Sequence, residues 1–215
     1  MKDLVIVGAG GLGREIAWLT ERINAKEPQW NLLGFLDDAP ALHGKSVNGY
    51  PVIGGCQDIP AKGELFAVCA IGAAAVRQKV TDRLKDIAPT LRFATLIDPC
   101  AVVSPRVTVG EGAVICAGAV VTVDISIGKH VLISSACTVG HDTVLSDHVT
   151  LYPGANVAGN VLLERGVEVG TGAQIIQGKR VGAHAIIGAG AVVVGDLPDR
   201  CTAVGVPARP IKFQH

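Results

Sequence analysis

An aliphatic residue returns at every sixth position through the second half of this chain. From Ile97 to Val193, each sixth residue is isoleucine, leucine or valine, and neither an insertion nor a deletion interrupts the series. Such a fixed period indicates a repeat architecture, because a short unit that cannot bury its apolar side chain alone must stack on similar neighbours. Few folds are compatible with this spacing.

The hexapeptide pattern predicts a left-handed parallel β-helix. Residues two positions before each repeated aliphatic are mostly small or apolar, as at Ala113 and Ala119, and glycine often follows it. Alternating inward residues describe a short strand, and the glycine is expected to permit the corner after it. Three hexads make one coil, so residues eighteen positions apart should stack, which places His141 between Val123 and Gly159.

The first 95 residues have a different pattern, typical of a small Rossmann-like α/β domain with a parallel sheet. The pattern predicts strands at 4–7, 32–36 and 66–71, and helices at 14–26 and 76–87. We therefore expect two domains, an α/β domain over 1–95 and a left-handed β-helix with a C-terminal tail over 96–215.

A glycine-rich loop follows the first predicted strand. Gly8, Gly10 and Gly13 match G-x-G-x-x-G, a motif that lets backbone N–H groups and a helix N-terminus approach phosphate oxygens. Asp37 and Asp38 end the second strand, where a ribose or a base edge could be read. The domain is too short for a full dinucleotide fold, so a mononucleotide-linked ligand is expected. A tight turn without a ligand is the alternative.

Composition excludes several classes of partner. The 19 Lys and Arg residues balance 19 Asp and Glu residues, which argues against nucleic acid or an anionic membrane surface. Hydrophobic residues make up 49% of the chain and aromatic residues only 4%, a mixture that suits stacked strands. Continuous apolar runs of membrane-spanning length are not present. The start of the chain does not resemble a secretory signal, so a cytoplasmic location is expected.

The cysteine and histidine positions do not predict a metal site. Six cysteines show neither a C-x-x-C pair nor a zinc-type spacing, so free thiols are expected. His130, His148 and His184 should share one corner of the β-helix by their spacing. A metal-binding ladder there is the less favoured alternative, because no carboxylate or cysteine completes a ligand set.

Four further segments occur in a characteristic order after the glycine loop. They are GFLDD at 34–38, a His-Asp pair at 141–142, AGN at 158–160 and GVPAR at 205–209. Together with the uninterrupted hexapeptides, they resemble the sugar O/N-acetyltransferases of the left-handed β-helix superfamily. The likeness covers nearly the whole chain.

The resemblance implies a set of site residues. His141 would act as general base, oriented or made more basic by Asp142, and a backbone N–H near Gly159 is our candidate oxyanion donor. Nucleotide-sugar contacts would fall on Gly10, Gly11, Leu12, Asp37, Asp38 and Gly72. Acetyl-CoA contacts would fall on Gly159, Thr150, Thr171 and Ala189.

The chain departs from the family pattern at several positions. Many members have histidine where Leu12 and Thr150 stand, asparagine where Ser134 stands, and His-Pro where Asp98 and Pro99 stand. These changes leave the His-Asp pair intact and put the detailed sugar and CoA contacts in question.

The implied activity is transfer of an acetyl group from acetyl-CoA to the 4-amino group of a nucleotide-linked 4-amino-4,6-dideoxy sugar. GDP-perosamine is the expected acceptor, and a UDP-4-amino sugar or a sialic-acid hydroxyl is the alternative. The resemblance also implies a homotrimer with active sites between neighbouring prisms, and no metal.

Two other classes of function stay open. In the first, the β-helix only assembles the protein and the α/β domain senses a nucleotide without catalysis. In the second, the glycine loop at 8–13 binds NAD. Loss of acetyl transfer on removal of His141 would exclude the former, and absence of NAD binding would exclude the latter.

Overall fold

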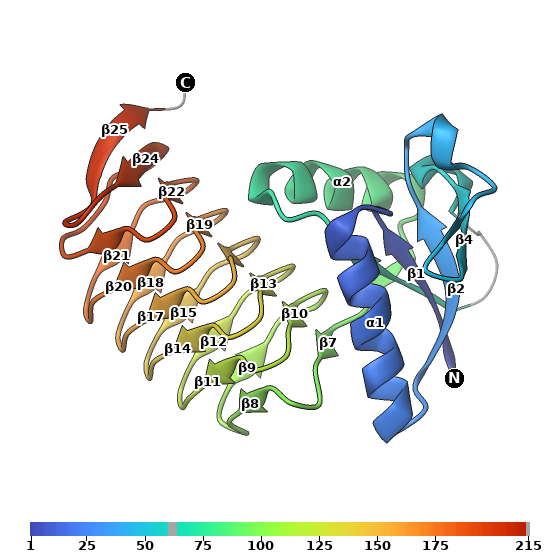
Figure 1. The fold of residues 1–215 in the computed structure, drawn as a ribbon, viewed down its shortest axis with the longest axis horizontal. Helices are drawn as coiled ribbons and strands as arrows, with labels where there is room; N and C mark the ends of the chain where they lie inside the picture. Colours follow the sequence, from blue (N-terminus) through green and yellow to red (C-terminus); the bar gives the residue numbers. More distant parts are fainter. Residues whose placement is uncertain (60–63, 214–215) are drawn as a thin grey trace.

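The computed structural model describes residues 1–59 and 64–213. An N-terminal α/β domain lies beside one face of a long parallel β-helix (Figure 1). The α/β domain contains β1 (Lys2–Val7), α1 (Gly11–Lys26), β2 (Trp30–Leu36), a 3-10 turn (Pro40–Leu42), β3 (Ser46–Val47), β4 (Tyr50–Gly54), a second 3-10 turn (Cys56–Asp58), β5 (Leu65–Cys69), α2 (Ala74–Ile87) and β6 (Arg92–Phe93). Its sheet has the order β3-β4-β2-β1-β5-β6.

The predicted strands and helices of this domain are confirmed: four of them begin two or three residues earlier than predicted, and the strand predicted at 66–71 spans Leu65–Cys69. β1 is central and fully buried over its apolar residues because it pairs in parallel with both β2 and β5. α1 begins at Gly11, three residues earlier than predicted, because part of the glycine loop forms its first turn. The antiparallel pairing of β3 with β4 was not predicted.

The β-helix has three faces, each a sheet of stacked parallel strands. The first face contains β7 (Leu96–Ile97), β10 (Val114–Ile115), β13 (Leu132–Ile133), β16 (Thr150–Leu151), β19 (Glu168–Val169) and β22 (Ile186–Ile187), followed by the C-terminal strands β24 (Cys201–Val204) and β25 (Arg209–Phe213). The second contains β8 (Val102–Val103), β11 (Val120–Val121), β14 (Thr138–Val139), β17 (Asn156–Val157), β20 (Gln174–Ile175) and β23 (Val192–Val193). The third contains β9 (Thr108–Val109), β12 (Ser126–Ile127), β15 (Val144–Leu145), β18 (Leu162–Leu163) and β21 (Arg180–Val181).

The repeated aliphatic residues fill the interior of the prism. Every member of the series from Ile115 to Val193 is at most 4% exposed, and together they form one continuous core. Ile97, at the start of the series, is 37% exposed, and Val103 and Val109 are only partly buried. The series therefore predicts the interior correctly except at its first coil, where no preceding coil covers these side chains.

The corners of the prism use glycine in a way that the sequence pattern did not indicate. The glycine that follows an inward aliphatic, such as Gly128 or Gly140, has no left-handed backbone. It is required because a Cβ there would lie 2.6 Å from backbone atoms of the next coil. The left-handed conformation instead occurs two residues later, at every sixth residue from Gly112 to Gly190, where Asp142 is one of the positions.

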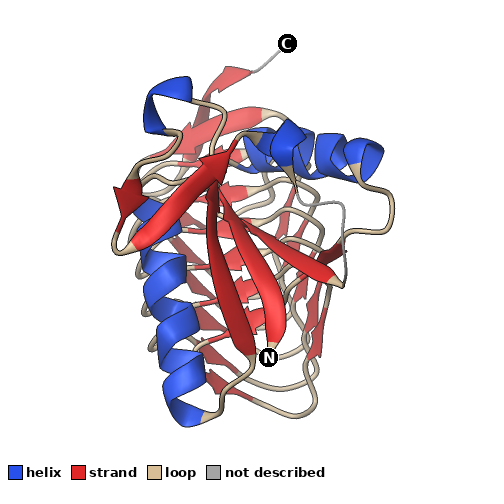
Figure 2. Ribbon diagram, turned by 90° about the vertical axis from the view of Figure 1, so that its right-hand side faces the viewer, coloured by secondary structure: helices blue, strands red, loops and turns tan. Residues whose placement is uncertain are grey.

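The α/β domain packs on the first face of the prism. Its core, which includes Leu4, Ile16 and Phe35, is continuous with the outward side chains of Val114 and Leu132. Figure 2 shows the sheet and both helices in front of the stacked coils. This docking leaves the second and third faces, and the corner between them, outside the interface between the domains.

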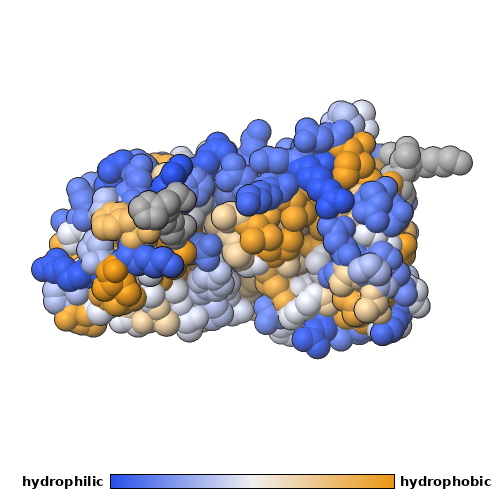
Figure 3. Space-filling model, turned by 90° about the horizontal axis from the view of Figure 1, so that it is seen from above, coloured by the Kyte–Doolittle hydropathy of each residue, from blue (hydrophilic) through white to orange (hydrophobic). Residues whose placement is uncertain are grey.

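All six cysteines are free thiols, five of them buried. Within residues 1–59 and 64–213, none of the helices has the length and apolar character needed to cross a membrane. Polar side chains cover most of the surface seen from above, with apolar side chains in separate patches between them (Figure 3). Large apolar side chains on the second face and its neighbouring corners include Val102 at 63% exposed and Val123 at 41% exposed.

Candidate active site

The His141–Asp142 pair lies on the corner between the second and third faces. β14 ends just before it, and Asp142 takes a left-handed backbone, with φ of 58°, that turns the chain toward β15. This turn brings Asp142 Oδ2 within 2.8 Å of His141 Nδ1. Both side chains are more than 60% exposed. An ionised carboxylate only accepts hydrogen bonds, so Nδ1 carries the proton and Nε2 of a neutral ring keeps its lone pair for a substrate.

Gly159 lies against the imidazole of His141, as the eighteen-residue spacing predicted. The Asn160 N–H donates to the carbonyl oxygen of His141 at 2.7 Å, and the Asp142 N–H donates to that of Val123 at 3.3 Å. A Cβ on Gly159 would lie 2.6 Å from both Cε1 and Nε2 of His141. The absence of a side chain at Gly159 therefore keeps the basic nitrogen accessible.

The glycine loop presents an uncapped helix N-terminus. A Cβ on Gly13 would collide with the carbonyl of Gly8, so this residue is needed for close packing of α1 on β1. Gly10 is the N-cap and makes no side-chain hydrogen bond, and the first turn contains no acidic residue. A Cβ on Gly10 would meet nothing within 4 Å. Open N–H groups at a positive helix end are suited to a phosphate group, and Leu12 lies half-buried beside them.

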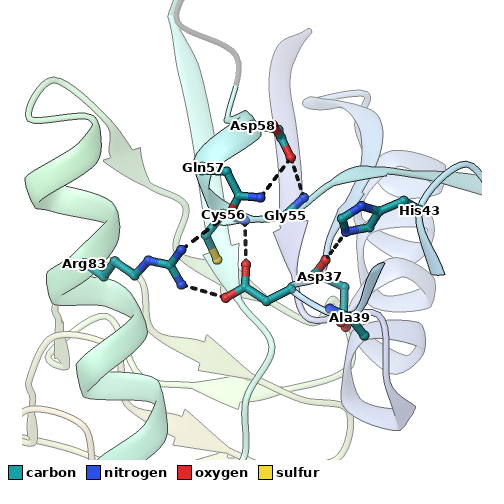
Figure 4. Close-up of polar contacts among 9 residues, drawn as sticks. Asp37, Ala39, His43, Gly55, Cys56, Gln57, Asp58 and Arg83 are labelled. Carbon is teal, nitrogen blue, oxygen red and sulfur yellow. Dashed lines mark hydrogen bonds and ion pairs between the residues drawn. The ribbon is translucent and has the colours of Figure 1, made fainter. Parts of the chain in front are cut away.

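Asp37 contacts this loop through the N–H of Ala9, and Asp38 follows it in the chain; each carboxylate already accepts hydrogen bonds from the protein. Figure 4 shows the polar contacts around Asp37, Cys56 and Arg83. The two carboxylate oxygens of Asp37 accept hydrogen bonds from the N–H groups of Ala9 and Ala39, each at 2.9 Å. Asp38 accepts from the Cys56 N–H at 2.8 Å and pairs with Arg83 at 2.7 Å. The Cys56 N–H and the Arg83 guanidinium lower the pKa of Asp38 below its usual value.

Thr150 and Gly72 lie at the interface between the two domains. The Thr150 hydroxyl donates to the carbonyl oxygen of Gly72 at 2.9 Å, and the Thr150 residue is fully buried. In this chain the docked α/β domain therefore covers Thr150, and its contact with acetyl-CoA stays a prediction. Gly72 itself is half-buried, with its Cα beside the ring of Tyr152.

Arg77 joins the domains at the same place and was not predicted. Its guanidinium, 2% exposed, donates to six uncharged oxygen atoms, those of Ile71, Gly72, His130, His148, Val149 and Thr150. Burial lowers the pKa of Arg77. The helical spacing could have indicated that Arg77 is buried, because it lies on the same inward face of α2 as Ala74, Thr81 and Leu84.

A second contact across the interface explains the departure at Asp98. Its carboxylate is 2% exposed and forms a paired contact with Arg22 of α1, with distances of 2.8 and 3.0 Å. Burial opposes ionisation of Asp98, but the hydrogen bonds from Arg22 hold its pKa below the usual value. Asp98 therefore anchors α1 to the β-helix.

Thr171 and Ala189 are exposed on a different corner, between the first and second faces. They stack on each other, and the Gly190 N–H donates to the carbonyl oxygen of Thr171 at 2.9 Å. Within one chain, the structure thus brings together His141, Asp142 and Gly159, but leaves Thr171 and Ala189 on another edge of the prism. The glycine loop and the two aspartates form a third group, in the α/β domain.

Comparisons with known proteins place these features in one class of enzyme. Residues 3–84 match the family described as PglD N-terminal domain. Solved structures that include a perosamine N-acetyltransferase and the acetyltransferase domain of PglB match almost the whole chain at 32% identity or more. The chain therefore belongs to the hexapeptide-repeat family of sugar N-acetyltransferases, and it is an acetyltransferase.

Three solved structures illustrate the similarity. The H141N mutant of perosamine N-acetyltransferase from Caulobacter crescentus, in complex with CoA and GDP-perosamine, is 32% identical, with a TM-score of 0.90 and coverage of 99% of this chain and 98% of that one. The acetyltransferase domain of PglB from Neisseria gonorrhoeae is 34% identical, with a TM-score of 0.87 and coverage of 98% and 100%. WeeI from Acinetobacter baumannii is 30% identical, with a TM-score of 0.87 and the same coverage. The comparison with curated proteins finds no match.

Proposed function

We propose that this protein transfers the acetyl group of acetyl-CoA to the 4-amino group of GDP-perosamine. The observation that carries the proposal is the His141–Asp142 pair, whose exposed Nε2 is free to accept a proton. Support for the substrates comes from the perosamine N-acetyltransferase of C. crescentus, which holds CoA and GDP-perosamine and matches this chain over 99% of its length.

In this mechanism, the neutral sugar amine attacks the thioester carbonyl carbon. His141 Nε2 takes the proton that the nitrogen loses as the C–N bond forms, and Asp142 stabilises the resulting imidazolium. The N–H of Gly159 has no acceptor among the hydrogen bonds of the described residues, and we assign it to the oxyanion. When the C–S bond breaks, the proton passes from His141 to the departing CoA thiolate. The products are an N-acetyl sugar and free CoA.

The two halves of the site face away from each other in a single chain. The α/β domain covers the first face, and His141 lies on the corner between the other two faces, on the opposite side of the prism. We therefore propose that a neighbouring chain supplies His141 to each nucleotide site, in a homotrimer. Exposed aliphatic side chains at Val102, Val120 and Val144 on the second and third faces support contacts between prisms.

The test is release of free thiol from acetyl-CoA in the presence of GDP-perosamine, UDP-4-amino sugars or free sialic acid. We expect release with GDP-perosamine and a loss of about 10²- to 10⁴-fold in the His141→Ala variant. Release with sialic acid alone would replace the N-acetyl assignment by O-acetyl transfer. If none of the acceptors supports release, the proposal is wrong and a binding function becomes the better explanation.

A further inference from the structure

Arg83 and Asp38 form an exposed pair at the edge of the candidate nucleotide site. Asp38 follows the carboxyl end of β2, and Arg83 reaches it from α2, with 2.7 Å between the guanidinium nitrogen and Oδ2 (Figure 4). The side chains are 47% and 48% exposed, so both groups remain accessible to a ligand. The Cys56 N–H fixes the other carboxylate oxygen, Oδ1, at 2.8 Å.

The pair presents an ordered row of hydrogen-bonding groups. Each oxygen of Asp38 accepts one protein donor and keeps a further lone pair, because a carboxylate offers about four acceptor sites. Arg83 has five N–H donors, of which few are used in its contacts with Asp38 and Gln57. The row therefore consists of a donor, the Arg83 guanidinium, followed by two acceptors, the oxygens of Asp38.

Guanine and uracil differ in how they match this row. The Watson–Crick edge of guanine presents the O6 acceptor, the N1–H donor and the N2–H donor, which complement Arg83 and the two oxygens of Asp38. The edge of uracil presents O4, N3–H and O2, so its second carbonyl would face a carboxylate oxygen. Repulsion between two acceptors selects against such a ligand.

The location of the pair fits a base linked to a diphosphate. Asp37, the residue before Asp38, is hydrogen-bonded to the Ala9 N–H of the glycine loop at 2.9 Å. A diphosphate at the N-terminus of α1 would thus extend its nucleoside toward the end of β2. This placement rests on the proposed function.

We propose that Arg83 and Asp38 together select guanine over uracil, with Arg83 donating to O6 and Asp38 accepting from N1–H and N2–H. Arg83 is then a specificity-determining residue of the nucleotide-sugar site. The hydrogen bond from the Cys56 N–H, assisted by Arg83, lowers the pKa of Asp38, which keeps this carboxylate in its acceptor form at neutral pH.

Calorimetric titration of the full chain with GDP, UDP and xanthosine diphosphate tests the assignment. We expect the wild type to bind GDP at least about tenfold more tightly than UDP. Arg83→Met removes the donor to O6 and should reduce this ratio severalfold. Asp38→Asn replaces an acceptor by an amide donor, which suits the O2 carbonyl of xanthine, and should shift the preference from GDP toward xanthosine diphosphate. Arg92→Met, a substitution of an exposed arginine paired with Glu64, is the control and should leave the ratios unchanged.

Three results would overturn the inference. The first is binding of UDP by the wild type that is equal to or tighter than binding of GDP. The second is equal weakening of GDP and UDP binding by Arg83→Met, which would place Arg83 on the shared ribose or diphosphate. The third is no gain in binding of xanthosine diphosphate by Asp38→Asn. Thiol release is also measured with a UDP-linked 4-amino sugar, so that failure of guanine selection can be distinguished from failure of the proposed function. Acetyl transfer to that acceptor would retain the sugar N-acetyltransferase and reject guanine selection, whereas no transfer to any nucleotide sugar would reject both.

Discussion

Gly159 and His141, eighteen residues apart, are stacked so closely that a Cβ on the glycine would lie 2.6 Å from Nε2 of the imidazole. The contact is a direct consequence of the coil length, because each coil places the same position of the repeat above the previous one. Space beside Nε2 of His141 thus depends on a residue that contributes no side chain.

Gly159→Ala should lower kcat by about 10- to 100-fold, because the methyl group must displace the imidazole from its position, and a shift of about 1 Å at a reacting group costs that much. The backbone of Gly159 is not left-handed, so alanine adds no strain of its own. Gly195→Ala is the control, since a Cβ there meets nothing within 4 Å. Steady-state rates of thiol release check the prediction, and an unchanged kcat in Gly159→Ala would contradict it.

Asp142→Asn should reduce kcat with little effect on folding. Asparagine tolerates the left-handed backbone at this position, whose φ is 58°, so the corner is preserved. The amide cannot stabilise an imidazolium as a carboxylate does, and we expect a loss of roughly tenfold or more. Rates at saturating substrate, with circular dichroism as the folding control, test this. Full activity would mean that Asp142 only shapes the turn.

Mixed oligomers should recover activity from two inactive variants if neighbouring chains share each site. His141→Ala removes the base, and Gly11→Glu places a carboxylate at the N-terminus of α1, where it competes with phosphate without meeting protein backbone. Random mixing of equal amounts should restore about a quarter of the wild-type sites in a closed ring. Co-expression of differently tagged chains, followed by the thiol assay, provides the measurement. A site contained within one chain would show no recovery.

Arg77→Met should lower the free energy of unfolding by about 3 kcal/mol or more, because hydrogen bonds to a charged donor are lost and buried carbonyls become unsatisfied. Arg77→Lys should also be destabilising, since three ammonium donors cannot reach all six acceptors. Urea denaturation measures the change. The exposed Arg92→Met substitution should cost little, and equal losses at both positions would show that the buried contacts of Arg77 are not responsible.

Acid should destabilise the protein through His130 and His148, whose buried rings stack with 5.1 Å between centroids. Burial lowers the pKa of His130 to about 3 and that of His148 to about 4. In the unfolded chain both would titrate near 6.5, so between about pH 6.5 and 4 the unfolded state binds more protons. The free energy of unfolding should therefore fall as the pH falls, by up to about 1.4 kcal/mol per pH unit for each ring.

His148→Asn provides the comparison for this pH dependence, because asparagine does not titrate and accepts the left-handed backbone at that corner, whose φ is 61°. Urea midpoints between pH 7 and pH 4.5 should show a shallower slope in the variant than in the wild type. Parallel slopes in the two proteins would exclude His148 as a source of the acid sensitivity.

The candidate site divides into a part that was predictable and a part that was not. His141, Asp142 and Gly159 are one coil apart or adjacent, so the repeat determines their distances. Arg83 and Asp38 are separated by 45 residues and lie on a helix and a strand whose packing no local pattern specifies. Thr150 occupies a strand position like any other in its face, and only the docked α/β domain makes it buried.

The sequence by itself determined the β-helix, its inward residues and the corner on which His141 stands. A short fixed period repeats one local geometry, so each hexad predicts the next without knowledge of distant contacts. The tertiary structure alone decided where the α/β domain lies. That choice depends on contacts between segments far apart in the chain, such as Arg77 with the carbonyls of His130 and His148 and Arg22 with Asp98. By covering the face opposite His141, the docked domain determines which residues can meet within one chain.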